Sequence, residues 1–335
     1  MTSYSARLIV LGTVGFGLLM FSARTAAQQE STPPSLPTTL ETLVETLGGN
    51  LIRDEQGRVE LVNLSYTPVT DTDLAHLEGL PALETLRLQF TEVTDAGLAH
   101  LTELPSLKTL RLQHTEVTDA GLAHLTSLPA LELLSLQYTD ITAAGLVHLA
   151  RIPTLAFLYL AETQVTDAGL AHLAGLPALE VLALDRTLTT DVGLVHLAGL
   201  PGLKTLYLNR LPITDAGLVH LTGLPALEFL DLDHTAITDA GLAHITELPA
   251  LETLRLSRLP ITDTGLVHLA GLPVLKTLYL NHTQVTDEGL PFLGGLPALE
   301  TLWVSGTEVT FDGYADLSKL FPFIVVMKRE GLLPR

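Results

Sequence analysis

The sequence predicts an α/β solenoid, right-handed and curved like a horseshoe, with a parallel β-sheet on its concave face and short helices on its convex face. Three observations predict this class. Seven apolar positions recur every 24 residues through 59–320, without insertion or deletion, which gives eleven units. Within each unit the apolar spacing changes from two residues to three. One strand and one short helix cannot bury seven apolar side chains alone, so neighbouring units must stack.

A single unit shows which elements to expect. The stretch "LETLRLQ" at 83–89 alternates apolar and polar residues, as does a short strand with one buried face. Leucines then recur at intervals of three through 98–104, as on one stripe of a helix. Asp95 precedes that stripe and is expected to cap the helix by accepting from its first free N–H groups. Pro105 ends the helix and returns the chain to the next strand.

The N-terminus predicts export. Residues 1–27 contain Arg7, a 14-residue run of mostly apolar residues at 8–21, and small residues near Ala27. This order is typical of a secretory signal peptide. The run is short for a membrane span, which needs about 20 residues. We expect a periplasmic, cell-envelope or extracellular protein with no stable membrane insertion after cleavage; an uncleaved N-terminal anchor is the alternative.

The two ends of the repeat array predict closing segments. Residues 28–37 are polar and Pro-rich, which favours a linker. Residues 38–58 predict an N-terminal helical cap, because Thr38 stands at capping-box spacing from a Glu and Gly48 can supply a left-handed stop. Residues 321–335 carry a last apolar strand and predict the C-terminal cap, since terminal repeats must differ to close the core.

Composition excludes several classes of partner and chemistry. The formal net charge is −19, and nucleic-acid affinity depends on many Lys and Arg contacts with phosphate, so nucleic acid is not expected as a partner. There is no Cys, which excludes disulfides, thiolate metal sites and a Cys nucleophile.

The repeated pattern "LxxLxLxxTxVTDAGLAHLxxLPx" resembles the leucine-rich repeat family. It is most similar to the ribonuclease-inhibitor-like group and to bacterial repeats that share the "GLAHL" phrase. The resemblance spans 59–320 and implies an interaction scaffold without a reaction. One slot departs from the family, which usually has Asn or Cys after the strand. This chain has Thr there in most units and Leu in two of them, Leu211 and Leu259. A Thr hydroxyl can still bond the backbone of the loop.

Thr, Asp and His recur within the phrase "VTDAGLAHL" and could be taken for a hydrolase or metal constellation. A His occupies one slot in nine units: His76, His100, His124, His148, His172, His196, His220, His244 and His268. Metal ligands must lie near 2 Å from one ion, whereas neighbouring helices pack about 8–10 Å apart. An enzyme needs one preorganised site and not nine copies of it. We therefore expect packing from these His residues, and neither catalytic residues, a metal nor a cofactor.

Binding is expected where the units differ. The variable columns are the outward strand positions, which are those of Thr85, Arg87 and Gln89 in one unit, and the rim position, which is that of Phe90. These columns hold six Arg and four acidic residues, a net +2, on an otherwise acidic chain. Aromatic residues and Arg are enriched at binding hot spots, although aromatic residues also fill ordinary β surfaces. The best single patch is predicted in the middle of the array: Phe157, Tyr159, Arg186, Tyr207, Arg210 and Phe229.

The sequence therefore predicts an exported, non-enzymatic scaffold that binds a protein partner through its concave face. The alternative is a cell-envelope structural or glycan-binding protein, with sugars stacked on Tyr159, Tyr207, Tyr279 and Trp303. No nucleophile–base pair stands outside the repeat framework, and there is no phosphate-binding Gly loop or metal-ligand spacing. An active site assembled from several repeats is left open by the sequence.

Overall fold

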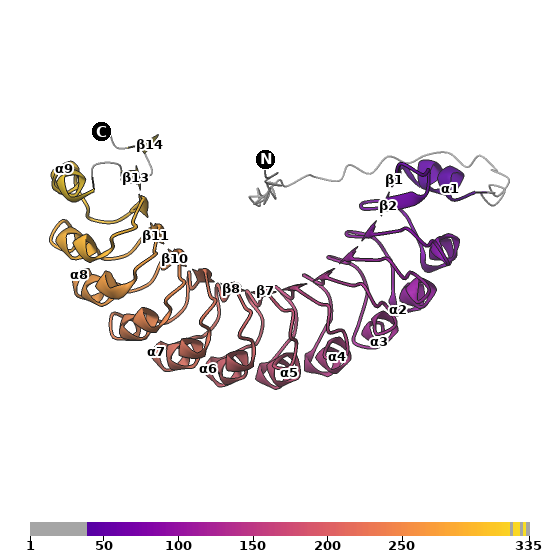
Figure 1. The fold of residues 1–335 in the computed structure, drawn as a ribbon, viewed down its shortest axis with the longest axis horizontal. Coiled ribbons are helices and arrows are strands. Elements are labelled where there is room, and N and C mark those ends of the chain that lie inside the picture. Colours follow the sequence, from indigo (N-terminus) through magenta and orange to yellow (C-terminus); the bar gives the residue numbers. More distant parts are fainter. Residues whose placement is uncertain (1–38, 322–323, 329–330, 333–335) are drawn as a thin grey trace, which may run out of the picture. The chain divides into compact units, whose positions relative to one another are not determined.

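The computed structural model describes residues 39–321, 324–328 and 331–332. The predicted signal peptide at 1–27 and linker at 28–37 lie outside these residues. Within the array the strands line the inner curve and the helices lie on the outer curve (Figure 1). The predicted α/β solenoid is therefore confirmed.

The inner curve is one 14-stranded sheet whose strands follow chain order. Strands β2 to β13 are parallel, and each residue pairs with the one 24 positions later, as Leu86 does with Leu110. Only β1 and β14 at the two ends are antiparallel to their neighbours. The strands are β1 (Asn50–Arg53), β2 (Val59–Asn63), β3 (Thr85–Arg87), β4 (Thr109–Arg111), β5 (Leu133–Ser135), β6 (Phe157–Tyr159), β7 (Val181–Ala183), β8 (Thr205–Tyr207), β9 (Phe229–Asp231), β10 (Thr253–Arg255), β11 (Thr277–Tyr279), β12 (Thr301–Trp303), β13 (Val325–Lys328) and β14 (Gly331–Leu332).

The outer elements are short, and many contain 3-10 helix in place of the single helix expected. Leucines spaced by three suit a 3-10 helix, which has 3.0 residues per turn. The α-helices are α1 (Leu40–Leu47), α2 (Asp95–Leu98), α3 (Leu122–Leu125), α4 (Ala143–Leu149), α5 (Asp167–Leu173), α6 (Asp191–Leu194), α7 (Asp215–Leu218), α8 (Asp263–Leu266) and α9 (Phe311–Leu320). The 3-10 helices are η1 (Asp71–Leu77), η2 (Ala99–Leu101), η3 (Val195–Gly199), η4 (Val219–Gly223), η5 (Gly241–Glu247), η6 (Val267–Gly271) and η7 (Leu290–Gly295).

The repeated apolar positions form one continuous core between the sheet and the helices. Leu86 on β3 and Leu98 on α2 are both fully buried. Thr189 is the one polar residue in these columns and is equally buried, but its hydroxyl accepts a hydrogen bond from the Thr187 hydroxyl at 3.1 Å. A buried polar group costs little when it is hydrogen-bonded, so this unit keeps the frame of its neighbours.

The prediction that Asp95 caps its own helix is wrong. Thr94 is the N-cap residue, and its hydroxyl accepts from the N–H of Ala96 at 3.2 Å. Thr94 has the extended backbone that a cap requires, whereas Asp95 already lies in the first turn. Its carboxylate instead accepts from the N–H and hydroxyl of Thr118 in the next unit, at 2.7 and 2.6 Å.

The same Asp–Thr link joins nine pairs of neighbouring units. Each carboxylate binds both the backbone N–H and the hydroxyl of the Thr that lies 23 residues later. The pairs are Asp71–Thr94, Asp95–Thr118, Asp119–Thr142, Asp167–Thr190, Asp191–Thr214, Asp215–Thr238, Asp239–Thr262, Asp263–Thr286 and Asp287–Thr310. The ladder is interrupted at Thr166, because Ala143 occupies the Asp position before it.

Short elements close the two ends of the core. Helix α1 begins after the N-cap Thr39, one residue later than the expected Thr38, which lies outside the described residues. Gly48 ends this helix in the left-handed conformation, with φ 81°. At the other end, α9 buries Tyr314, and β13 extends the parallel sheet by one strand.

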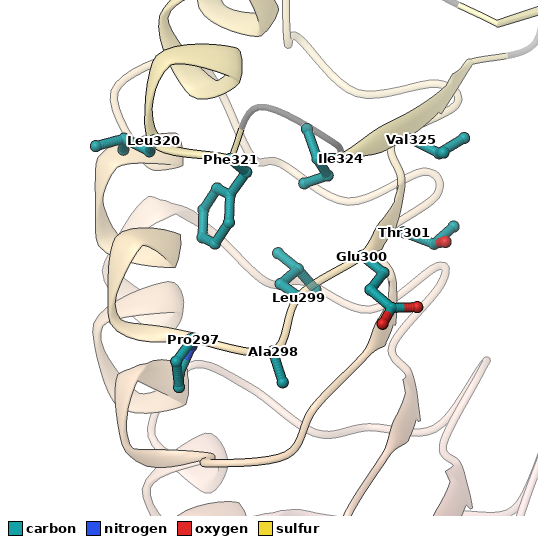
Figure 2. A pocket seen from close by; sticks show the side chains of 9 residues that line it. All are labelled: Pro297, Ala298, Leu299, Glu300, Thr301, Leu320, Phe321, Ile324 and Val325. Atoms are coloured by element: carbon teal, nitrogen blue, oxygen red, sulfur yellow. The ribbon is translucent and has the colours of Figure 1, made fainter.

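A hollow of about 600 Å³ lies at the C-terminal end of the core, between the last repeat, α9 and β13 (Figure 2). Phe321, Ile324 and Leu299 line it, and Glu300 is the one titratable residue among the described residues of its lining. A single carboxylate without a partner base or nucleophile offers no acid–base pair, so we ascribe this hollow to the packing of the chain end.

Candidate functional site

The Thr, Asp and His residues of the repeated phrase lie in the framework, away from the concave face. Eight of the nine His side chains are half-buried on the outer elements, and His172 is exposed. Two of them bind within the framework: Nδ1 of His76 lies 3.1 Å from the Asp73 carbonyl, and Nδ1 of His100 lies 2.6 Å from the Glu78 carboxylate. In the described part of the chain, no group of three His, Asp or Glu side chains is placed to hold a metal ion.

The structure places the aromatic residues of the predicted patch on strands of the concave face and brings two of them into contact. Phe157 and Tyr159 lie on β6, Tyr207 on β8 and Phe229 on β9. The rings of Tyr207 and Phe229 contact each other, with centroids 4.9 Å apart. Tyr159 and Tyr207 flank Ala183, the small residue between them in the register. Burial raises the pKa of Tyr159 and raises that of Tyr207 to about 12, so both hydroxyls stay protonated at neutral pH.

The two Arg residues of the patch lie at the rim, where β7 and β8 end. Arg186 forms an ion pair with Glu162 of the preceding unit. Arg210 is exposed, and no ion pair to it is present among the described residues. The two cations therefore differ, because Arg186 must exchange a partner to bind a ligand and Arg210 need not.

Sequence reasoning missed a buried charge cluster beside this patch. The guanidinium of Arg255 lies 2.7 Å from the carboxylate of Asp233 and 3.4 Å from that of Asp231. Burial, together with the charge of Asp233, raises the pKa of Asp231 to about 7. Burial likewise raises the pKa of Asp185 to about 6. A signal was available, because acids two residues apart on one strand must share a face.

A polar hollow of about 420 Å³ opens on the same face, over the ends of β8 to β12. Asp233, Arg255 and Trp303 form part of its lining. The residues that line it are Asn209, Arg210, Asp233, His234, Arg255, Ser257, Arg258, Asn281, His282, Trp303 and Ser305. This mixture of amides, cations and one large ring suits a polar partner group more than an apolar one.

The rim slot, which is the position three residues after the end of each of the strands β2 to β12, has a backbone feature that the sequence did not reveal. In ten successive units its residue is not Gly and yet has positive φ, between 52° and 63°. Only the last unit has a Gly there, Gly306 with φ 72°. Positive φ is rare for side chains other than Gly, Asn and Asp, and such strain is concentrated at functional sites.

None of the helices in the described segments combines the length and the apolar character that crossing a membrane requires.

A framework that repeats every 24 residues, with an inner face whose side chains change from unit to unit, defines a solenoid scaffold. Family models described as leucine rich repeat match residues 177–237, and also 103–126 and 271–293. The chain is a leucine-rich repeat protein. No curated protein matches it.

Two solved structures resemble the chain. An internalin (inlF) from Listeria monocytogenes matches at 21% identity with a TM-score of 0.52, over 89% of this chain and 99% of the internalin. The structure titled PEPR1–AtPEP1 matches at 16% identity with a TM-score of 0.42, over 82% of this chain and 49% of that one. The first likeness concerns the fold alone, and the second is too weak to support an argument.

Proposed function

We propose that the protein is an exported, non-enzymatic scaffold that binds a partner protein on its concave face. The observation that supports this most is the contrast between the two faces. Threonine and aspartate of the repeated phrase bind within the framework, whereas the concave face gathers half-buried rings beside the exposed Arg210, to which no ion pair is present among the described residues. Large rings and Arg are the side chains that dominate binding energies at protein interfaces.

The central patch of six residues is the proposed contact region: Phe157, Tyr159, Arg186, Tyr207, Arg210 and Phe229. Its rings supply apolar area, and Arg210 supplies an exposed charge at the rim. Rings buried at the centre and charges at the edge are the usual arrangement of a protein interface.

Partner capture tests the proposal. The full chain is immobilised and exposed to envelope and extracellular fractions, beside a Tyr159→Ala/Tyr207→Ala/Arg210→Ala variant. We expect a partner that the wild type retains and the folded variant loses. A His172→Ala/His196→Ala/His220→Ala variant is the matched control on the outer face and should retain the partner. Identical capture of the partner by all three proteins would contradict binding on the concave face.

The glycan alternative makes a different prediction. Sugar binding should depend on the rings of Tyr159, Tyr207, Tyr279 and Trp303. A protein partner should depend also on Arg186 and Arg210 and weaken with added salt, because salt screens exposed charges. The structure limits the alternative, since Tyr279 and Trp303 stack on each other at 5.4 Å and one face of each ring is therefore covered.

Export is proposed on the signal-like residues 1–27. Mass spectrometry of the protein recovered from its host should show a mature N-terminus near residue 28, and an intact N-terminus would favour the anchor.

A further inference from the structure

Four aromatic rings form a continuous stack along the rim at the N-terminal end of the array. Tyr66, Phe90, His114 and Tyr138 follow β2, β3, β4 and β5, and their ring centroids are 4.4, 4.2 and 4.2 Å apart in that order. The rings are nearly parallel, with interplanar angles of 12°, 19° and 11°. Tyr66 is 72% exposed, Phe90 43% and Tyr138 49%, so the stack presents an apolar ridge to solvent.

The backbone under this stack is strained. The φ angles of Tyr66, Phe90, His114 and Tyr138 are 61°, 60°, 53° and 58°. The left-handed conformation is unfavourable for residues with a Cβ, and Gly is the residue that adopts it freely. The N–H of each residue bonds to the next strand, as that of Phe90 does to the Gln113 carbonyl at 2.8 Å, and this fixes the conformation. The repeat framework has this left-handed turn in every unit, whether or not the residue is aromatic. The aromatic rings are therefore not needed for the turn, which points to a binding role for them.

Two cations without counter-charges lie beside the stack. Arg87 on β3 and Arg111 on β4 are direct neighbours in the sheet register. Within the described segments neither guanidinium forms an ion pair, and the Nε atom of each is buried without a hydrogen-bond partner. Arg255 is the contrast on the same face, because Asp231 and Asp233 both hold its guanidinium. Burial lowers the pKa of Arg111, and the charge of Arg87 lowers it further.

Two glutamine side chains next to the Arg pair have oxygen atoms without hydrogen-bond donors in the part of the chain that the structure describes. The side-chain oxygens of Gln89 and Gln113 are buried, and neither has a hydrogen-bond partner among the described residues. Both residues stand between the Arg column and the ring stack in the sequence, two positions after Arg87 and Arg111, which end β3 and β4. A buried polar atom without a partner is unfavourable, so a ligand that supplies donors to these side chains is favoured.

We propose that Arg87, Arg111 and the ring stack form a docking site for an extended acidic segment of a partner protein. Carboxylates of the segment pair with the two guanidinium groups, and its apolar side chains pack along the ridge of ring edges. Rotation of the Gln89 and Gln113 side chains, whose oxygens are buried in the free protein, presents these acceptors to backbone N–H groups of the segment. This inference rests on the proposed protein-binding function and adds the chemistry of the partner.

The stacking geometry selects a peptide over a sugar chain. Sugars bind aromatic side chains through the faces of the rings, but in this stack the inner faces are covered by neighbouring rings. What remains along the ridge is ring edge, against which aliphatic and aromatic side chains pack well. An extended segment that runs along the array also directs alternate side chains to opposite sides, one row toward the ridge and one toward the Arg column.

A designed peptide tests the site with the full chain. The probe is a fluorescein-labelled decapeptide of alternating Leu and Asp, and binding is followed by fluorescence anisotropy. An Arg87→Gln/Arg111→Gln variant should bind it at least about tenfold more weakly, which corresponds to a loss of about 1.4 kcal/mol. A Tyr66→Ser/Phe90→Ser variant should also bind more weakly, and replacing Asp with Asn in the peptide should abolish binding. Arg151→Gln, which removes an exposed Arg from the outer face, should leave the affinity unchanged.

Folding and charge are controlled separately. Circular dichroism of each variant checks that the solenoid is intact, and an Arg87→Lys/Arg111→Lys variant should keep most of the affinity because it keeps the charges. Equal binding by wild type and Arg87→Gln/Arg111→Gln, or no binding by the wild type, would overturn the inference. Tighter binding of polygalacturonate than of the peptide would overturn it in favour of an acidic glycan.

The outcome is separable from that of the proposed function. The Tyr159→Ala/Tyr207→Ala/Arg210→Ala variant should still bind the decapeptide, because its substitutions lie outside the proposed site. If the peptide fails to bind while this variant still loses its captured partner, the inference fails and the central patch stands. If the peptide binds at the Arg pair while partner capture is unaffected by the central variant, the central patch is the wrong region.

Discussion

The carboxylate of Asp95 accepts two hydrogen bonds from Thr118, one from its backbone N–H at 2.7 Å and one from its hydroxyl at 2.6 Å. The two residues are 23 positions apart and belong to successive units. Thr118 therefore holds the carboxylate of the unit before it, while Asp119 beside it binds Thr142 of the unit after it. This ladder accounts for Thr and Asp in the repeated phrase without any chemistry at a substrate.

Removing one link should destabilise the array. Asp95→Ala deletes both acceptors and leaves the Thr118 N–H without its partner. We expect a loss of about 1–2 kcal/mol in the free energy of unfolding, since hydrogen bonds to charged groups contribute about 1.5–3 kcal/mol and this pair is partly exposed. Thermal unfolding followed by circular dichroism measures the change. An unchanged midpoint would show that the ladder contributes nothing.

Supplying the missing link should stabilise the array. Ala143→Asp places a carboxylate one unit before Thr166, where the ladder is interrupted. A gain of about 0.5–1.5 kcal/mol is expected from the new charge-assisted bonds. Ala144→Asp is the matched control, because it adds the same charge to the first turn of α4 without facing Thr166. Equal stabilisation by both variants would assign the gain to the helix dipole instead.

The Gly of the phrase should be intolerant of a side chain. A Cβ on Gly97 would collide with the Asp71 carboxylate, which Thr94 holds in place. Gly97→Ala is expected to cost about 1–3 kcal/mol in the free energy of unfolding, as overpacking does in cores. Gly175→Ala is the control, because no atom lies within 4 Å of its added Cβ. Comparable unfolding midpoints for the two variants would contradict this explanation of Gly97.

The buried acid cluster should make stability fall as pH rises. The pKa of Asp231 is raised from 3.8 to about 7 in the folded state, so between these values the folded chain binds the proton that the unfolded chain releases. Its contribution to stability is therefore present at low pH and lost as pH rises to about 7.

Asp231→Asn should remove that dependence. Asn keeps an acceptor for the Asp233 N–H, which now bonds the carboxylate at 2.9 Å, and Arg255 keeps Asp233 as its partner. We expect the variant to gain about 1–3 kcal/mol over wild type at pH 8, with a smaller gain at pH 4.5. Unfolding midpoints at both pH values measure this. A variant less stable than wild type at pH 8 would show that the charged form of Asp231 is favourable.

Most of the fold could be predicted because it depends on local spacing. Leu86 and Leu88 are two apart and Leu98 and Leu101 are three apart, so the order of strand and helix follows from the sequence. The Asp–Thr ladder could not be predicted in the same way. Asp95 stands where a local N-cap is plausible, and its true partner is set by how units stack.

The candidate site was predicted in part. The concave columns placed Tyr207 and Phe229 on one face, and their rings do contact each other. The stack from Tyr66 to Tyr138 was missed because it depends on a left-handed backbone at the end of each strand, and no Gly or Asn marks that conformation. The Arg255 cluster was missed although Asp231 at the end of β9 and Asp233 two residues later indicated it.

The most direct test of the central claim is a footprint of the bound partner. The full chain is oxidised by hydroxyl radicals with and without the captured partner, and the modified side chains are quantified by mass spectrometry. We expect protection of Tyr159, Tyr207 and Phe229 on the concave face, with His148 and His172 on the outer face unchanged. Protection of the outer His residues, with the concave rings equally oxidised in both samples, would contradict it.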